Sequence, residues 1–188
     1  TGLLVISKEP QEWLPGAYVQ ALRIAGTELT DPIRDERRID GTVPDQVRQL
    51  DELTKLWIEH PTVVGGAVRT TAPTYPEAAL RQLLRNALLH RTYEGSNAPV
   101  RVTWYDDRVE ILSPGGPYGQ VTLENFGTPG ITDYRNLTLA EALRNLDYVE
   151  KFGVGLPIAS RTLADNGNPP PEFRREPNYI HVTVRRRP

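Results

Sequence analysis

The stretch Tyr75–Gly116, YPEAALRQLLRNALLHRTYEGSNAPVRVTWYDDRVEILSPGG, decides the fold. Its first half predicts a helix that starts at Pro76, because leucine and alanine recur at spacings of three and four and form one apolar face. A polar stripe lies beside that face, since Gln82, Asn86 and His90 are four residues apart. Such a helix can pack on a sheet while its polar stripe faces a ligand. The apolar positions are Leu80, Leu83, Leu84, Ala87 and Leu88.

The second half of this stretch predicts a β-hairpin. Val100, Val102 and Trp104 alternate with polar residues, and Asp106-Asp107 supplies a turn. The returning strand then runs to Pro114-Gly115-Gly116, where a second turn is expected. Helix and hairpin together predict a layered α/β unit.

Composition indicates a soluble globular protein, with 188 residues of which 38% are hydrophobic and 24% charged. No apolar run approaches the roughly 20 residues of a membrane span, and no signal peptide is visible. The chain has no cysteine, which excludes disulfides and thiolate metal sites and fits a cytoplasmic protein. The three histidines are scattered, so a zinc site has little support. A chain with no methionine is expected to be a piece of a longer protein.

Charge does not favour a strong nucleic-acid binder, since the formal net charge is −2. The basic tail Arg185-Arg186-Arg187 is open to two interpretations. A solvated chain end is favoured over a phosphate contact.

The region before the central stretch predicts strands at 2–7, 18–24, 37–39 and 67–70, and an amphipathic helix from Pro44 to His60. Its apolar side carries Val47, Leu50, Leu53, Leu56 and Trp57.

The region after the hairpin begins with a glycine- and proline-containing connection over 115–136. It is too long for an ordinary loop, so a lid or a mobile segment is expected. Thr138 and Glu141 form a capping box that predicts a helix to about Val149, with Leu146 among its inward residues. The remaining expected elements are a glycine turn at 153–156, a helix at 157–165 and a closing strand at 179–184.

Three motifs each have two interpretations, one chemical and one purely structural. Asn86 can offer an oxygen to Mg²⁺ near a phosphate, or it can be a surface residue of its helix. Gly153-Val154-Gly155 can bring backbone N–H groups close to a phosphate, or form a tight turn. Pro114-Gly115-Gly116 can contact an adenine or only reverse the chain.

In their order along the chain, these motifs resemble the GHKL (Bergerat) ATPase fold of gyrase, chaperone and histidine-kinase ATPase domains. The chain more closely resembles a bacterial family of transcriptional regulators that carry a Schlafen/Alba-type N-terminal domain and a RecG-like C-terminal ATPase domain. The resemblance is dense over about 70–188. Its matching stretches are Leu80–Tyr93, Pro99–Pro117, Thr122–Asn125, Arg135–Leu156 and Pro169–Phe173.

This resemblance implies an α+β fold: a two-layer α/β sandwich of GHKL, histidine-kinase ATPase-like type over 66–188, preceded by a smaller α/β domain over 1–65. It also implies that the full-length protein carries a DNA-associated N-terminal domain, absent here, through which DNA is its partner. A homo-oligomer is a further possibility, and no membrane association is expected.

The resemblance also assigns roles in binding ATP and Mg²⁺. Asn86 matches the Mg²⁺-binding asparagine of the N box. Gly115 and Gly116 lie at the adenine-side glycine box, while Gly153 and Gly155 match the second glycine box, which covers the phosphates. The segment 118–136 takes the place of the ATP lid.

The sequence departs from that pattern at two positions. Gln82 stands where GHKL hydrolases carry the general-base glutamate, and an amide cannot accept a proton at neutral pH. Ser113 stands where an aspartate binds the adenine amino group, and we include it with His90 among the candidate nucleotide-binding residues. We therefore expect nucleotide binding with weak or no hydrolysis, or alternatively a vestigial structural or dimerisation module that binds no nucleotide. A P-loop helicase is excluded, because no lysine stands in a GxxxxGK motif.

Overall fold

One mixed sheet of six strands forms the centre of the computed structural model, which describes residues 2–60, 62–63, 70–149 and 153–188. The elements, in chain order, are α1 (Gly2–Ile6), η1 (Pro10–Glu12), β1 (Val19–Ile24), β2 (Ile33–Ile39), α2 (Val43–Trp57), β3 (Thr62–Val63), β4 (Thr70–Thr71), α3 (Glu77–His90), β5 (Val100–Trp104), β6 (Arg108–Pro114), α4 (Leu137–Asn145), α5 (Gly155–Asp165), β7 (Glu172–Glu176) and β8 (Tyr179–Arg185).

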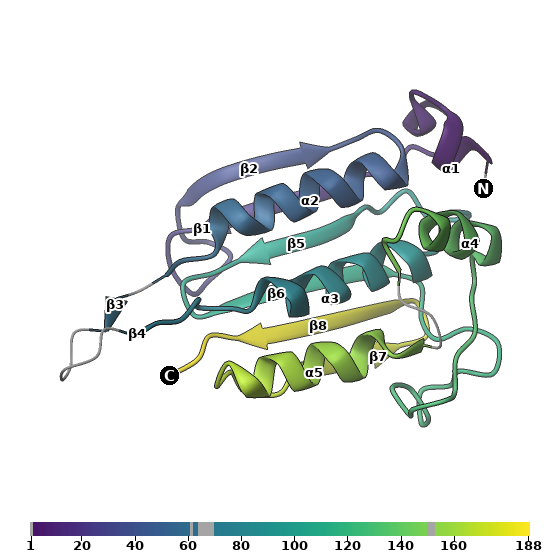
Figure 1. Ribbon diagram of the computed structural model, residues 1–188. Helices are drawn as coiled ribbons and strands as arrows, with labels where there is room; N and C mark the ends of the chain where they lie inside the picture. The colour runs from purple at the N-terminus through teal and green to yellow at the C-terminus, as the bar shows by residue number, and fades with distance from the viewer. Residues whose placement is uncertain (1, 61, 64–69, 150–152) are drawn as a thin grey trace.

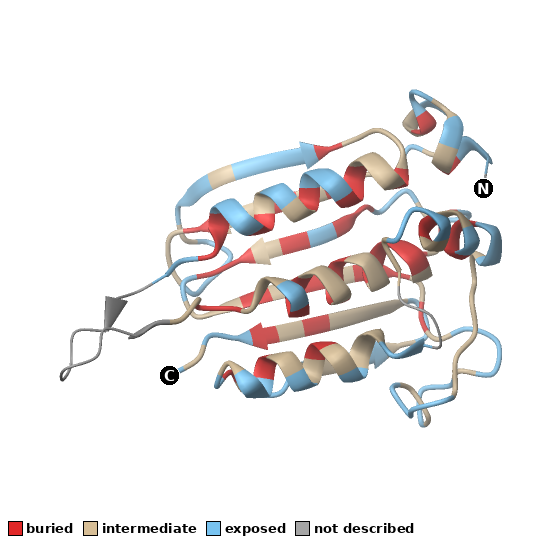
Figure 2. Ribbon diagram, viewed as in Figure 1, coloured by how far each residue is buried: buried red, intermediate tan, exposed pale blue. Residues whose placement is uncertain are grey.

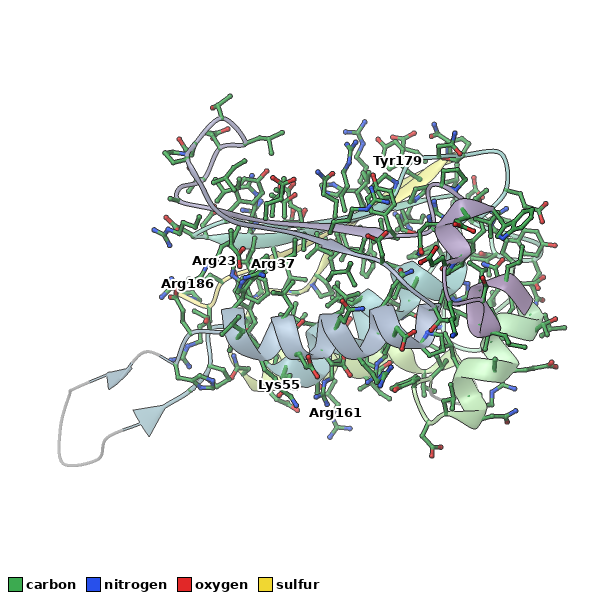
Figure 3. The ribbon with its side chains drawn as sticks, turned by 90° about the horizontal axis from the view of Figure 1, so that it is seen from above. Arg23, Arg37, Lys55, Arg161, Tyr179 and Arg186 are labelled. Carbon is green, nitrogen blue, oxygen red and sulfur yellow. The ribbon has the colours of Figure 1, made fainter. Side chains whose placement is uncertain are left out.

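The strand order in this sheet is β2-β1-β5-β6-β8-β7. β1 and β5 are parallel, and every other neighbouring pair is antiparallel. Helices α2, α3 and α5 lie side by side across one face of the sheet (Figure 1). In the view from above, Tyr179 lies on the open side of the sheet and Arg161 on the far side of the helical layer (Figure 3). The predicted two-layer α/β sandwich is confirmed.

The core lies between these two layers, where buried residues of helices and strands face one another (Figure 2). Every predicted apolar residue of α3 is buried, as are the alternating Val100, Val102 and Trp104 of β5. The periodicity of α3 therefore fixes which side of this helix lies on the sheet, and its polar stripe is left at the edge of the core.

The predicted strand at 2–7 is wrong, because the chain forms the short helix α1 there. An isolated apolar run has no periodicity that separates a helix from a strand. Leu4 is the buried residue of α1, while Ile6 is 81% exposed. The segment lies against α2 and α4 and pairs with no strand.

Helix α2 is confirmed, with Thr42 as its N-cap accepting a hydrogen bond from the Asp45 N–H. It ends at Trp57, three residues before the expected His60. The prediction for Leu56 is wrong, since this side chain is 69% exposed. Leu56 adjoins Trp57 in sequence but points about 100° away around the helix.

Helix α4 starts one residue before the expected cap, so the predicted capping role of Thr138 is wrong. Asn136 occupies the N-cap position, and its side chain donates to the carbonyls of Leu89 and Arg91, at 2.8 Å each. These bonds satisfy carbonyls at the C-terminal end of α3 and fix the connection before α4. The helix ends at Asn145, and Leu146, predicted to point inward, is half exposed.

The C-terminal region follows the expected order. Helix α5 starts at Gly155, two residues earlier than predicted, and Gly167 follows its end with a φ of +81°. The closing strand is confirmed as β8, while β7 beside it was not predicted. The basic tail pairs within the chain, through Arg185 with Glu172 and Arg186 with Glu59.

The division into domains at 1–65 and 66–188 stays a prediction, and the structure adds that strands of both parts pair in one sheet through β1 and β5. The predicted strand at 67–70 falls mostly outside the described residues. Across the described residues, none of the helices has the length and apolar character needed to cross a bilayer.

Candidate functional site

A cavity of about 160 Å³ lies between α3, the ends of β6 and β8, the connection 115–136 and the start of α5. All of the site residues predicted from the sequence line it, although they come from segments far apart along the chain. These residues are Gln82, Asn86, His90, Ser113, Gly115, Gly116, Gly153 and Gly155.

The polar stripe of α3 meets the first residue of α5. A Cβ placed on Gly155 would lie 3.1 Å from Gln82 Oε1 and 3.2 Å from Asn86 Nδ2. The missing side chain therefore lets the positive N-terminal end of α5 approach these amides. Asn86 Nδ2 is buried and has no hydrogen-bond partner among the described residues. A buried donor without a partner is costly, and a bound ligand could satisfy it.

Ser113 lines the cavity from the C-terminal end of β6. Its hydroxyl donates to the Ala87 carbonyl at 2.7 Å, so its proton is already used and its oxygen can only accept from a ligand. Both neighbouring glycines also have a structural role. A Cβ on Gly115 would lie 2.3 Å from Thr92 Oγ1, and one on Gly116 would lie 2.4 Å from the Glu176 carbonyl oxygen.

The glycine turn before α5 packs against the connection. Gly153 has a φ of +64°, a backbone region that favours glycine. A Cβ here would lie 2.3 Å from Thr132 Cγ2. Gly153 of the predicted second glycine box is therefore covered by the segment that the resemblance identifies as a lid.

Side chains of the connection 115–136 fasten it over the cavity, although the connection contains no helix or strand. The ring of Tyr134 stacks on His90 with centroids 5.6 Å apart and planes 16° apart. Arg144 lies over the same tyrosine, 6.0 Å from its centroid. Within the connection itself, Arg135 lies over Tyr118 at 4.8 Å and donates to the Gly116 carbonyl at 3.1 Å. Through Tyr134, the connection is therefore held against α3 and α4 beside the cavity.

Electrostatically, the cavity is nearly neutral. Burial, with a smaller contribution from Arg135, lowers the pKa of His90 to about 4, so the imidazole is uncharged at pH 7. Asp133 is the one charged side chain among the described residues that line the cavity. Its carboxylate accepts hydrogen bonds from the backbone N–H groups of Gln120 and Tyr134. Most of the remaining lining is apolar, as in sites that bury a planar ring.

Sequence reasoning missed the aromatic side chains of the site. Tyr118, Phe126 and Tyr134 reach the cavity from the connection, and Phe173 reaches it from β7. The rings of Phe126 and Phe173 lie 5.6 Å apart. Aromatic residues inside a glycine- and proline-containing segment were the available signal, because such residues need a surface to pack on.

Metal binding at this site would require a bound nucleotide, because the described part of the protein offers few metal ligands. The described residues hold no group of three or more His, Cys, Asp or Glu side chains that could bind an ion. Asn86 is the oxygen donor predicted for Mg²⁺. Mg²⁺ is commonly held by one or two protein oxygens together with water and substrate phosphates, so this site fits the ion only with a nucleotide present.

The two-layer architecture is that of a GHKL-type ATPase fold, and the comparisons with known proteins agree. Residues 97–184 match the family model described as "Putative ATP-dependent DNA helicase recG C-terminal", which supports a RecG-like ATPase-type C-terminal domain.

Among solved structures, the chain is similar to the DIP2311 protein from Corynebacterium diphtheriae, with a TM-score of 0.77 and 25% sequence identity. The match covers 90% of this chain and 35% of that protein, so the chain spans about a third of its length. No curated protein matches the sequence.

Proposed function

We propose that this chain is a nucleotide-binding module, which binds ATP with Mg²⁺ and hydrolyses it weakly or not at all. In this proposal the module is the C-terminal part of a bacterial transcriptional regulator. That regulator is cytoplasmic and contacts DNA through a Schlafen/Alba-type N-terminal domain. The observation that carries the binding proposal is Asn86, which lies between the cavity and the start of α5 and whose buried Nδ2 atom has no hydrogen-bond partner among the described residues.

Binding would use the two kinds of wall that the cavity offers. The apolar lining near Ser113 suits a base, and the Ser113 oxygen can accept a hydrogen bond from an amino group. The start of α5 suits phosphates, because free N–H groups and the helix dipole both favour an anion there. Asn86 would offer its oxygen to Mg²⁺ held by those phosphates.

Calorimetric titration with ATP and Mg²⁺ tests this proposal. The wild type is expected to release or take up heat on binding, and Asn86→Ala is expected to bind at least tenfold more weakly. Asn145→Ala, an exposed asparagine at the end of α4, is the matched control and should bind like the wild type. Absence of binding in the wild type would end the nucleotide proposal.

Weak or absent hydrolysis follows from Gln82, which lines the cavity where a general base is expected. Its amide can position a water molecule but cannot take a proton from it. Phosphate release from the wild type should stay near background. Gln82→Glu is the variant in which hydrolysis would appear, since it restores a proton acceptor at the same place.

A second candidate is a vestigial module that acts in structure or dimerisation. This candidate is favoured by the small space beside the glycine turn, where a Cβ on Gly153 would meet Thr132 and one on Gly155 would meet Gln82. Size exclusion with light scattering gives the oligomeric state, and the titration gives nucleotide binding; together they distinguish the two proposals. A dimer that binds no nucleotide fits this candidate, whereas a monomer that binds Mg-ATP rules it out.

A further inference from the structure

The size of the cavity limits which part of a nucleotide it can enclose. Its volume is about 160 Å³. A cavity of roughly 150 Å³ holds a single benzene ring. A space of this size suits a base, and a ribose with phosphates would extend beyond it.

A second, outer opening continues the cavity. It lies between the connection, the first turn of α5 and strand β7. Part of its lining also lines the cavity, whereas Ser160 and Arg175 line the outer opening alone. The path between the two spaces thus passes along the N-terminal end of α5. The shared residues are Phe126, Gly127, Pro129, Leu156, Pro157 and Phe173.

Arg175 brings a positive charge to this path. No lysine or other arginine lines either space among the described residues. Arg175 is exposed, and neither an ion pair nor a side-chain hydrogen bond joins it to another described residue. Along β7, Phe173 and Arg175 share one face and Arg174 takes the other. An exposed guanidinium that pairs with none of the described residues, at the mouth of an almost uncharged cavity, suits an acidic group of the ligand.

We infer that Arg175 binds the acidic end of the nucleotide, with Ser160 beside it, while the base lies in the enclosed cavity. This inference rests on the proposed nucleotide binding and extends it. The ligand class is a nucleoside phosphate whose phosphate chain runs along the start of α5 to the outer opening. Arg175 is thereby a residue that distinguishes a nucleoside phosphate from the bare nucleoside.

Titrations of ATP and of adenosine, each against the wild type, Arg175→Ala and Arg174→Ala, test the inference. Arg175→Ala should weaken ATP binding about fivefold to tenfold, since a single exposed charge contact is lost. Adenosine binding should not change, because adenosine has no acidic group. Arg175→Lys should keep most of the ATP affinity.

Arg174→Ala is the matched control on the same strand. Arg174 pairs with Glu176 at 3.2 Å and lies 5.8 Å from the ring centroid of Tyr179, which is on the open side of the sheet (Figure 3). Its loss should alter neither affinity. Equal loss of ATP and adenosine binding in Arg175→Ala, or unchanged ATP binding, would overturn the inference alone. A wild type that binds neither ligand would overturn the proposed function, and the inference with it.

Discussion

Gly155, the first residue of α5, lies so close to Asn86 of α3 that a Cβ added to it would be 3.2 Å from the Asn86 Nδ2 atom. The contact joins two segments that are far apart in sequence and brings the positive end of one helix to the polar stripe of another. It forms the wall of the cavity on which the proposed phosphate site depends.

Gly155→Ala should therefore weaken ATP binding while leaving the stability of the fold nearly unchanged. Alanine favours the helix by up to about 1 kcal/mol, which offsets the tight approach of the new methyl group to Gln82 and Asn86. The free energy of unfolding should change by less than about 1 kcal/mol, while ATP affinity falls because the Asn86 amide is displaced. Urea unfolding and calorimetry measure the two effects. In an Asn86→Ala background the same substitution should cost no further affinity.

Gly153→Ala should lower the free energy of unfolding by more than a Gly→Ala substitution whose only cost is a positive φ. A Cβ at this position meets both an unfavourable φ and Thr132 Cγ2 at 2.3 Å. The expected loss in unfolding free energy is about 2–3 kcal/mol. Gly167→Ala is the control, because its φ is also positive and nothing lies within 4 Å of its Cβ. Its cost should be about 1 kcal/mol, and equal losses would mean that the contact with Thr132 is unimportant.

Tyr134→Ala should loosen the connection 115–136 from α3. The substitution removes the ring that stacks on His90 and lies below Arg144. Backbone amides of the connection should exchange faster with deuterium, and limited proteolysis should cut it sooner. Tyr179→Ala, on the open side of the sheet, should leave both rates in the connection unchanged. Unchanged protection in Tyr134→Ala would show that other contacts hold the connection.

His90 should make stability depend on pH between about 6.5 and 4. The unfolded chain binds a proton at a pKa near 6.5, whereas burial lowers the pKa of the folded protein to about 4. The unfolded state thus binds more protons in this window, so stability present above pH 6.5 is lost as the pH falls towards 4. The contribution is at most about 3 kcal/mol.

His90→Phe isolates this effect from the titration of carboxylates, because it keeps an aromatic partner for Tyr134. Urea unfolding of both proteins should show the stability of the wild type falling relative to the variant as the pH decreases from 7 to 4. A constant difference across that range would mean that His90 titrates normally in the folded protein.

The sequence predicted the elements with the clearest periodicity. The apolar face of α3, the hairpin of β5 and β6, and α2 all follow from spacings of three and four or of two. β7 could not be predicted this way. Its sequence EFRRE carries four charged residues, and pairing with β8 rather than its own pattern makes it a strand.

The candidate site could be predicted only in part. The family resemblance brought together Asn86, Ser113 and the glycines, and the structure places them around one cavity. Their roles in binding stay predictions. Arg175 was not foreseen, since a position beside the start of α5 depends on tertiary packing and leaves no local signal.

A crystal structure with a non-hydrolysable ATP analogue and Mg²⁺ would show whether this cavity binds a nucleotide. We expect a base beside Ser113 and His90, with phosphates at the start of α5 and Mg²⁺ at the Asn86 oxygen. An analogue bound elsewhere on the molecule, or a cavity left empty at saturating analogue, would contradict it.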